Sequence, residues 1–202
     1  MVVIAALSDL PDPAVVEVAA AALLEGLIIG LATDTVYGLA ARAADGAAVE
    51  RIYVAKNRPE HLALPVLVSD PDQADSVAHI GDLAAALIDG FWPGGLTIVC
   101  PARPGGSGQP ATVGLRWPRH ALAVALCRAV GPLATTSANR HGQPPATTAA
   151  TVSEVFGDQI ALVLDGGACL GAPSTVVDAT GSELVLLREG VIPWSELRTI
   201  RV

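Results

Sequence analysis

The sequence predicts an α/β fold, with a twisted sheet of mixed parallel and antiparallel strands and helices on its sides. Two observations predict it. Short apolar runs of strand length alternate with capped helical patterns through most of the 202 residues. Three strand-like runs then follow one another near the C-terminus, which favours parallel pairing through the earlier crossovers and antiparallel pairing at the end. No linker or repeat divides the chain, so we expect a single domain spanning residues 1–202.

The first half of the chain has clear helix boundaries. Asp12 and Pro13 provide the N-cap and first position of a helix that Gly26 closes. Asp45 caps a second helix, which Pro59 stops. In order, we expect a helix at 13–25, a strand at 27–32, a helix at 46–57, a strand at 64–69, helices at 71–79 and 82–91, and a strand at 96–100.

The second half begins with the most loop-like stretch of the chain, residues 101–111, which contain three glycines and three prolines. This stretch is a candidate for a lid over a site. After it we expect strands at 112–116, 133–136, 160–164, 175–179 and 183–187, and helices at 119–130, 148–156 and 193–199. A second polar loop, 137–145, follows the strand at 133–136.

Composition excludes several classes of protein. The formal net charge of −8 disfavours non-specific nucleic-acid binding, which needs a positive field. Three widely spaced cysteines without a CxxC pair argue against a disulfide framework or a zinc site. No apolar run reaches membrane-spanning length and no basic region precedes an apolar one at the N-terminus, so we expect a soluble, cytoplasmic protein.

Polar groups and cations gather where predicted strands end. In open α/β sheets ligands bind at such points, because the loops converge there. Each segment alone has an ordinary explanation, such as a turn cap or a surface ion pair. Together they make a candidate site for a small anionic ligand. The segments are Thr33–Thr35 with Lys56 and Arg58, then Arg116, then Ser137 with Asn139, and finally Ser174 and Thr175 with Arg188.

Motifs of covalent catalysis are missing from the sequence. There is no GxSxG elbow, HExxH pair, Walker lysine or GxGxxG turn, and the four histidines lack metal-ligand spacing. Any chemistry would therefore depend on positioning and charge stabilisation.

Seven ordered blocks resemble one known family. They are TDTVYGLA (33–40), KNRP (56–59), FWPGGLTIV (91–99), VGLRWPRH (113–120), PLATTSAN (132–139), PSTVVDATG (173–181) and LLREG (186–190). Their order is that of the YrdC/TsaC family of threonylcarbamoyl-AMP synthases and relatives. The resemblance covers about residues 10–198 and implies a YrdC-like fold around a concave, positively charged cleft.

The resemblance also implies a reaction and a set of site residues. Family members join L-threonine, bicarbonate and ATP into threonylcarbamoyl-AMP and pyrophosphate, for the modification of tRNA adenosine 37. The family's K-x-R and S-x-N pairs match Lys56, Arg58, Ser137 and Asn139, which implies catalytic and ATP-binding roles. Threonine-side positions match Thr33, Arg116 and Ser174, with Arg116 holding the carboxylate, and Arg188 matches the nucleotide side. Mg²⁺ is expected with the ATP, and tRNA or tRNA-modification transferase proteins are possible partners.

Three departures from the family pattern leave alternatives open. Ala32 stands where the family often has proline, His141 where serine is common, and Pro145 in a stretch that often carries a serine near the nucleotide. One alternative is therefore a YrdC-type paralogue with an altered substrate. Another is an RNA-binding module, although the acidic charge and the scarcity of aromatic residues argue against it.

Overall fold

The computed structural model describes residues 2–5, 10–57, 63–104, 111–140 and 142–200. Within them, ten strands form one sheet in the order β1-β8-β2-β3-β7-β4-β6-β5-β9-β10. The strands are β1 (Val2–Ala5), β2 (Ile29–Leu31), β3 (Gly38–Arg42), β4 (Val66–Leu67), β5 (Leu96–Pro101), β6 (Thr112–Arg116), β7 (Leu133–Ser137), β8 (Leu162–Asp165), β9 (Thr175–Asp178) and β10 (Val185–Arg188). The predicted mixed α/β sheet is confirmed.

Helices occupy the positions that the caps predicted. They are α1 (Pro13–Leu24), α2 (Gly46–Lys56), α3 (Pro71–Val77), α4 (Asp82–Phe91), α5 (Ala121–Val130), α6 (Ala149–Phe156) and α7 (Trp194–Leu197), with a short 3₁₀ helix at Gly157–Gln159. The side chains of Asp12 and Asp45 accept backbone hydrogen bonds at the N-termini of α1 and α2. Asn57, in a left-handed conformation, ends α2.

The distribution of strand directions differs from the expectation. Antiparallel pairs occupy the middle of the sheet, where β2 pairs with β3, β3 with β7, and β7 with β4. Parallel pairs lie on both sides of them, between β1, β8 and β2, between β4 and β6, and between β5 and β9. Antiparallel pairing at the C-terminus, expected for the last three predicted strands, holds only for β9 and β10.

Two strands, β1 and β3, were not predicted from the sequence. β3 has the sequence GLAAR, which lacks the β-branched and aromatic residues that mark strands. It forms because β2 and β7 pair with it on both sides, and its residues Leu39 and Ala41 pack against one face of the sheet while Ala40 packs against the other. β1 (Val2–Ala5) pairs with β8 at the edge of the sheet.

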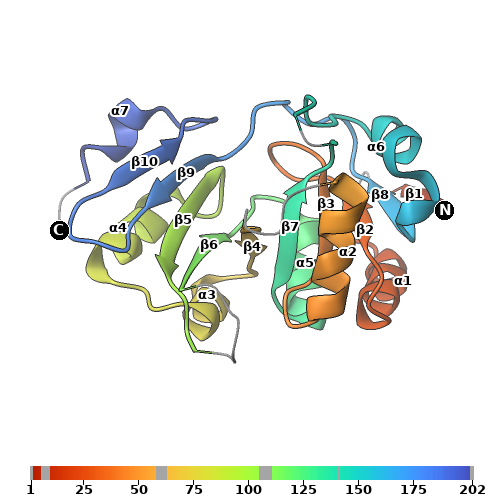
Figure 1. The fold of residues 1–202 in the computed structure, drawn as a ribbon, viewed down its shortest axis with the longest axis horizontal. Coiled ribbons are helices and arrows are strands. Elements are labelled where there is room, and N and C mark those ends of the chain that lie inside the picture. Colours follow the sequence, from red (N-terminus) through yellow and green to blue (C-terminus); the bar gives the residue numbers. More distant parts are fainter. Residues whose placement is uncertain (1, 6–9, 58–62, 105–110, 141, 201–202) are drawn as a thin grey trace.

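Helices cover both faces of the half of the sheet that contains β1, β8, β2, β3 and β7 (Figure 1). One face carries α2 and α6, whose residues Ile52 and Val152 belong to a buried cluster with Leu39. The opposite face carries α1 and α5, through Leu23 and Leu126. Gly30 of β2 allows α6 this close, because an added Cβ would lie 2.9 Å from Val152 Cγ1.

The other half of the sheet has its own buried cluster, made by β5, β6 and β9 with α3, α4 and α7. Figure 1 shows β4 between the two halves and the connection from β8 to β9 crossing from one half to the other. The polar loop predicted at 137–145 begins at the end of β7, at this junction. Residues 105–110 of the predicted 101–111 loop lie outside the described residues, so the lid stays a prediction. None of the described helices is long and apolar enough to cross a membrane.

Candidate functional site

A cavity of about 210 Å³ lies where the two halves of the sheet meet. Its walls come from the ends of β2, β3, β4, β6 and β7, from β5, and from residues around the start of β9 and the end of β10. Hydroxyl groups, two guanidinium groups and prolines dominate them. The lining consists of Leu31, Thr33, Thr35, Val36, Gly38, Pro65, Leu67, Thr97, Arg116, Thr135, Thr136, Ser137, Pro145, Pro173, Ser174 and Arg188.

The turn after β2 presents two threonine hydroxyl groups to the cavity. Thr33 Oγ1 donates to the carbonyl oxygen of Val36 at 2.7 Å and lies 3.0 Å from Thr35 Oγ1. A hydroxyl has one proton, and that of Thr33 is used on Val36, so Thr35 is the donor in the pair. Thr33 Oγ1 also accepts from the backbone N–H groups of Thr35 and Val36, so its lone pairs are used within the turn. Thr35 Oγ1 accepts from Arg116 Nη1 and keeps one lone pair for another donor.

Arg116, at the end of β6, is buried and held at three points. Its Nε donates to the carbonyl oxygen of Gly94 at 3.0 Å, its Nη1 to Thr35 Oγ1 at 2.8 Å and its Nη2 to Asp34 Oδ1 at 2.6 Å. Burial lowers the pKa of the guanidinium and Asp34 raises it. The ordinary explanation for Arg116 in the sequence was a surface ion pair. The structure does not support it, because only 7% of this residue is exposed.

Ser174 and Arg188 meet in the same half of the sheet as Arg116, just before β9 and at the end of β10. Arg188 donates from Nε and Nη2 to the carbonyl oxygen of Ser174, and from Nη2 to Ser174 Oγ at 3.2 Å. Ser174 Oγ also lies 2.9 Å from Thr97 Oγ1. Thr97 is a site residue that the sequence analysis missed. Its signal was a hydroxyl within the apolar run 96–100.

Lys56 lies behind the end of β7 and is 2% exposed. Its ammonium donates to the carbonyl oxygens of Ser137 and Asn139, the latter at 2.7 Å, and to Asn139 Oδ1 at 3.0 Å. Ser137 Oγ also donates to Asn139 Oδ1. These three family-motif residues thus form one cluster that fixes the 137–139 turn. Ser137 faces the cavity, whereas Lys56 and Asn139 support it from behind.

The structure therefore brings together most of the residues predicted from the sequence. Thr33, Arg116, Ser137, Ser174 and Arg188 line one cavity. Arg58, the remaining member of the K-x-R pair, lies outside the described residues, as does His141.

Two other positions of departure can be placed. Pro145 lines the cavity, so this departure from the family pattern occurs at the site itself. Ala32 is buried against the loop after β8. A Cβ added at Gly166 of that loop would lie 2.7 Å from the Cβ of Ala32.

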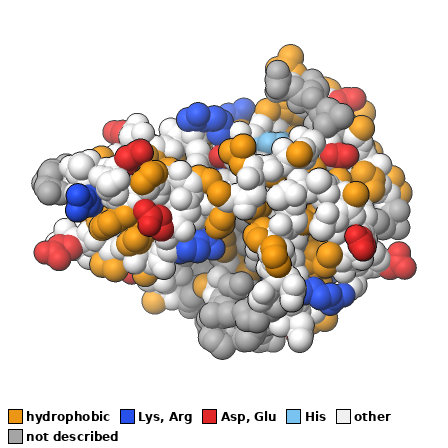
Figure 2. Space-filling model, turned by 90° about the horizontal axis from the view of Figure 1, so that it is seen from above, with side chains coloured by type: hydrophobic (Ala, Val, Ile, Leu, Met, Phe, Trp, Pro, Cys, Tyr) orange, Lys and Arg blue, Asp and Glu red, His pale blue; other side chains and the backbone are white. Residues whose placement is uncertain are grey.

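The charge of the cavity is positive. Arg116 and Arg188 are part of its lining, and that lining contains no carboxylate among the described residues. The surface in Figure 2 has basic side chains near the middle of the view, and most of its acidic side chains lie toward the two ends. A cavity with cations, hydroxyl groups and no carboxylate is suited to a small anionic ligand with polar substituents.

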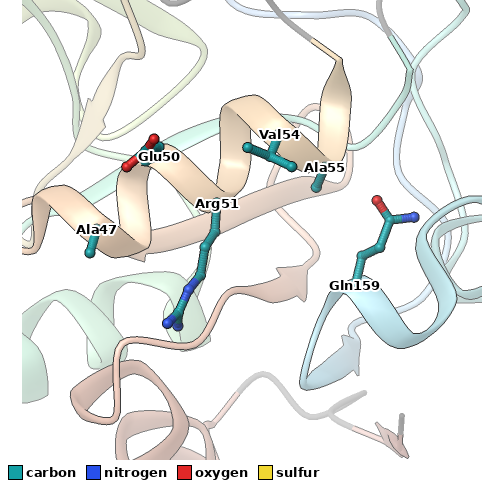
Figure 3. A pocket seen from close by; sticks show the side chains of 6 residues that line it. All are labelled: Ala47, Glu50, Arg51, Val54, Ala55 and Gln159. Atoms are coloured by element: carbon teal, nitrogen blue, oxygen red, sulfur yellow. The ribbon is translucent and has the colours of Figure 1, made fainter.

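A second hollow, of about 400 Å³, lies on the outer side of α2. Figure 3 shows Ala47, Glu50, Arg51, Val54 and Ala55 on this helix and Gln159 facing them. Arg51 Nη1 donates to the carbonyl oxygen of Gly26, so its charge is used to anchor α2 to the turn after α1. None of the residues that the sequence placed in the site lines this hollow, and we assign the site to the smaller cavity.

Comparisons with known proteins agree with the motifs. The family model Sua5/YciO/YrdC, described as "Telomere recombination", matches residues 21–190. The chain belongs to this family. A threonylcarbamoyl-AMP synthase of Bacillus subtilis is 38% identical over 197 residues, which cover 94% of this chain and 57% of that protein.

Solved structures of the Sua5/YciO/YrdC family share the fold. Sua5 of P. abyssi in complex with L-threonine superposes with a TM-score of 0.93 and 35% identity, covering 98% of this chain and 60% of that one. E. coli YciO has a TM-score of 0.84 at 24% identity, which supports the YrdC-like fold alone. The chain thus spans little more than half the length of the synthase and the threonine complex that it matches.

Proposed function

We propose that this chain is an L-threonylcarbamoyladenylate synthase, a nucleotidyltransferase that forms threonylcarbamoyl-AMP, pyrophosphate and water from L-threonine, bicarbonate and ATP. The observation that carries the proposal is the single cavity that combines Thr33, Arg116, Ser137, Ser174 and Arg188. Relatives at 38% identity have this activity in their names, and a relative at 35% identity has been solved with L-threonine.

Arg116 is the group that suits the carboxylate of threonine. Its contacts with Gly94, Thr35 and Asp34 use three N–H groups of the five that a guanidinium has. Among the described residues this leaves two N–H groups, on Nη1 and Nη2, for a ligand oxygen pair. A planar fork fixed in this way can bind a carboxylate through two parallel hydrogen bonds.

The hydroxyl groups around Arg116 suit the rest of the amino acid. Thr35 uses its proton on Thr33, so it offers a lone pair to a substrate donor such as the amine or the side-chain hydroxyl. Thr97 and Ser174 form a second hydroxyl pair on the other side of the cavity. We propose that these two pairs orient threonine so that its nitrogen faces the position of the bicarbonate carbon.

The cluster of Lys56, Ser137 and Asn139 is the proposed nucleotide side, together with Arg58 and Arg188. Lys56 places a positive charge behind the turn that presents Ser137 to the cavity. Arg188 lines the same cavity. Fixed positive charge near a triphosphate stabilises the charge that develops as the leaving pyrophosphate separates from the α-phosphorus.

Magnesium remains part of the proposal. The described residues contain no group of three or more His, Cys, Asp or Glu side chains that could hold a metal ion. Mg²⁺ bound to a nucleotide takes most of its ligands from phosphate oxygens and water, so hydroxyl groups such as that of Ser137 fit such an ion without a carboxylate cage. When bound, the ion would neutralise phosphate charge.

The experiment is pyrophosphate release by the purified chain. We expect release from ATP that requires both L-threonine and bicarbonate, and that falls strongly in Arg116→Gln. Arg128→Gln is the control, because Arg128 is exposed on α5 and does not line the cavity. Release that proceeds equally without threonine, or equal loss in both variants, would contradict the assignment.

The product's destination follows from the same proposal. Threonylcarbamoyl-AMP would supply the carbamoyl-threonine group for adenosine 37 of tRNA, through transferase proteins that accept it. A cytoplasmic location is consistent with this role and stays a prediction from the sequence.

A further inference from the structure

We propose that Asp34 is a positioning residue of the threonine site, which acts through Arg116. This inference rests on the proposed function for the identity of the ligand. Asp34 belongs to the TDTVYGLA block, but neither the block nor the family resemblance assigned it a role here. The structure points to it because of one ion pair.

The carboxylate of Asp34 and the guanidinium of Arg116 form a largely buried pair. Asp34 Oδ1 lies 2.6 Å from Arg116 Nη2, and the side chains are 17% and 8% exposed, respectively. In a second ion pair, between Arg103 and Asp75, the side chains are 39% and 60% exposed. Exposed pairs are weak, whereas loss of one partner from a largely buried pair leaves a poorly solvated charge without its partner.

Asp34 contacts the back of Arg116 rather than the cavity. Its neighbours in the sequence, Thr33 and Thr35, line the cavity, but Asp34 does not. Its carboxylate therefore acts on a ligand through the arginine.

Three contacts in three directions fix the guanidinium plane. Gly94 holds Nε, Thr35 holds Nη1 and Asp34 holds Nη2. The contacts with Gly94 and Thr35 are to neutral oxygens, and hydrogen bonds to ionised groups are roughly twice as strong. Asp34 therefore contributes the strongest restraint, and it determines which Nη2 proton stays available to a ligand.

Charge and geometry predict opposite results when Asp34 is replaced. If the carboxylate acted only as a charge, its loss would leave Arg116 more positive and threonine would bind more tightly. If it positions the guanidinium, its loss lets the fork rotate out of register with the carboxylate of threonine, and binding weakens. The sign of the change in affinity therefore distinguishes the two roles.

The first test is calorimetric titration of L-threonine and of ATP into the wild type, Asp34→Asn, Asp34→Ala and Asp75→Asn. We expect the threonine Kd to rise about 10- to 100-fold in Asp34→Ala and less in Asp34→Asn, which keeps an acceptor oxygen. The ATP Kd should stay the same, and Asp75→Asn should match the wild type. In turnover the effect should appear in the KM for threonine more than in kcat.

The second test does not depend on the proposed function. In protein labelled with ¹⁵N-arginine, the Nε–H signal of Arg116, assigned by its loss in Arg116→Lys, should exchange slowly with water. This proton is buried and bonded to Gly94. If Asp34 holds the side chain of Arg116, exchange should be at least about tenfold faster in Asp34→Asn. The substitution weakens one charge-assisted hydrogen bond, so the side chain leaves its bonded position about that much more often.

The outcomes separate the two proposals. A wild type that does not bind threonine overturns the proposed function, while the exchange rate still decides the role of Asp34. Unchanged or tighter threonine binding by both Asp34 variants, or an unchanged exchange rate in Asp34→Asn, overturns the positioning role. Asp34→Asn has nearly the shape of the wild-type residue, so it serves if Asp34→Ala does not fold.

Discussion

Replacing Lys56 tests whether its cluster holds the site together. The sequence places Lys56 and Arg58 at the end of a predicted helix, in a polar segment, where a replacement ordinarily leaves a fold intact. The structure contradicts this for Lys56, which is the last residue of α2 and is 2% exposed. It is also the only lysine in the chain.

The cost of Lys56→Met can be worked out from the three contacts between its ammonium and the 137–139 turn. Ser137 O keeps a hydrogen bond from the backbone N–H of Asn139, and Asn139 Oδ1 keeps one from Ser137 Oγ. The carbonyl oxygen of Asn139 has no other partner among the hydrogen bonds of the described residues. One orphaned carbonyl costs about 1–3 kcal/mol, and with the lost charge-assisted bonds we expect a total of about 3 kcal/mol.

Lys56→Ala should cost more than Lys56→Met. Alanine lacks the three methylenes that methionine replaces with atoms of similar volume, and each buried methylene contributes about 0.8 kcal/mol. We therefore expect about 2 kcal/mol of additional destabilisation, or about 5 kcal/mol in all. Such a loss is a large fraction of the 5–15 kcal/mol that stabilises a typical domain.

The assay is urea unfolding of both variants, with Arg128→Met as the control on the exposed side of α5. The control should stay within about 0.5 kcal/mol of the wild type. Labelling with an amine-specific reagent provides a second readout, since the Nζ atom of Lys56 should react only after unfolding. A Lys56→Met protein as stable as the control, or rapid labelling of the folded wild type at Lys56, would refute the reasoning.

Three further predictions concern the ligand and the pH dependence. Arg116→Lys keeps the charge but not the fork, so threonine affinity should fall about tenfold or more while ATP affinity holds in calorimetry; equal affinities would remove Arg116 from the site. Serine should support pyrophosphate release better than valine, because a site with hydroxyl partners rejects a ligand that lacks the hydroxyl; equal rates with valine and threonine would favour the altered-substrate paralogue. Burial lowers the pKa of His120, with the charge of Asp34 opposing the shift. The unfolded chain therefore binds the proton more readily, and the stability due to neutral His120 is present above its ordinary pKa of 6.5 and lost as the pH falls below it. Urea unfolding at about pH 7.5 and about pH 5.5 should show a smaller pH-dependent loss in His120→Gln than in the wild type, and equal losses would contradict this.

Local patterns predicted the helices well. Asp12 and Asp45 mark the N-termini of α1 and α2 because a side-chain cap is a contact between near neighbours in sequence. β3 shows the limit of such patterns. Its alanines and glycine favour no strand, and it takes this conformation because β2 pairs with it on one side and β7, nearly a hundred residues away in the chain, on the other.

In the site, too, local patterns could be predicted from the sequence and contacts between distant residues could not. The types of residue at strand ends were visible in the sequence, and the family motifs selected those that the structure brings into one cavity. The pairing of Arg116 with Asp34 was not visible, because the two residues are 82 positions apart and belong to different motifs. Nor could the sequence show that Lys56 is buried, since a lysine at a helix end is ordinarily solvated.

The central claim is that the cavity between the two halves of the sheet converts threonine into an activated carbamoyl adenylate. Mass spectrometry of the product formed from ATP, L-threonine and bicarbonate labelled with carbon-13 tests it directly. We predict a product with the mass of threonylcarbamoyl-AMP that carries the label, and its disappearance when threonine is omitted or Arg116 is replaced by glutamine. An unlabelled adenylate, or AMP and pyrophosphate formed without threonine, would contradict the claim.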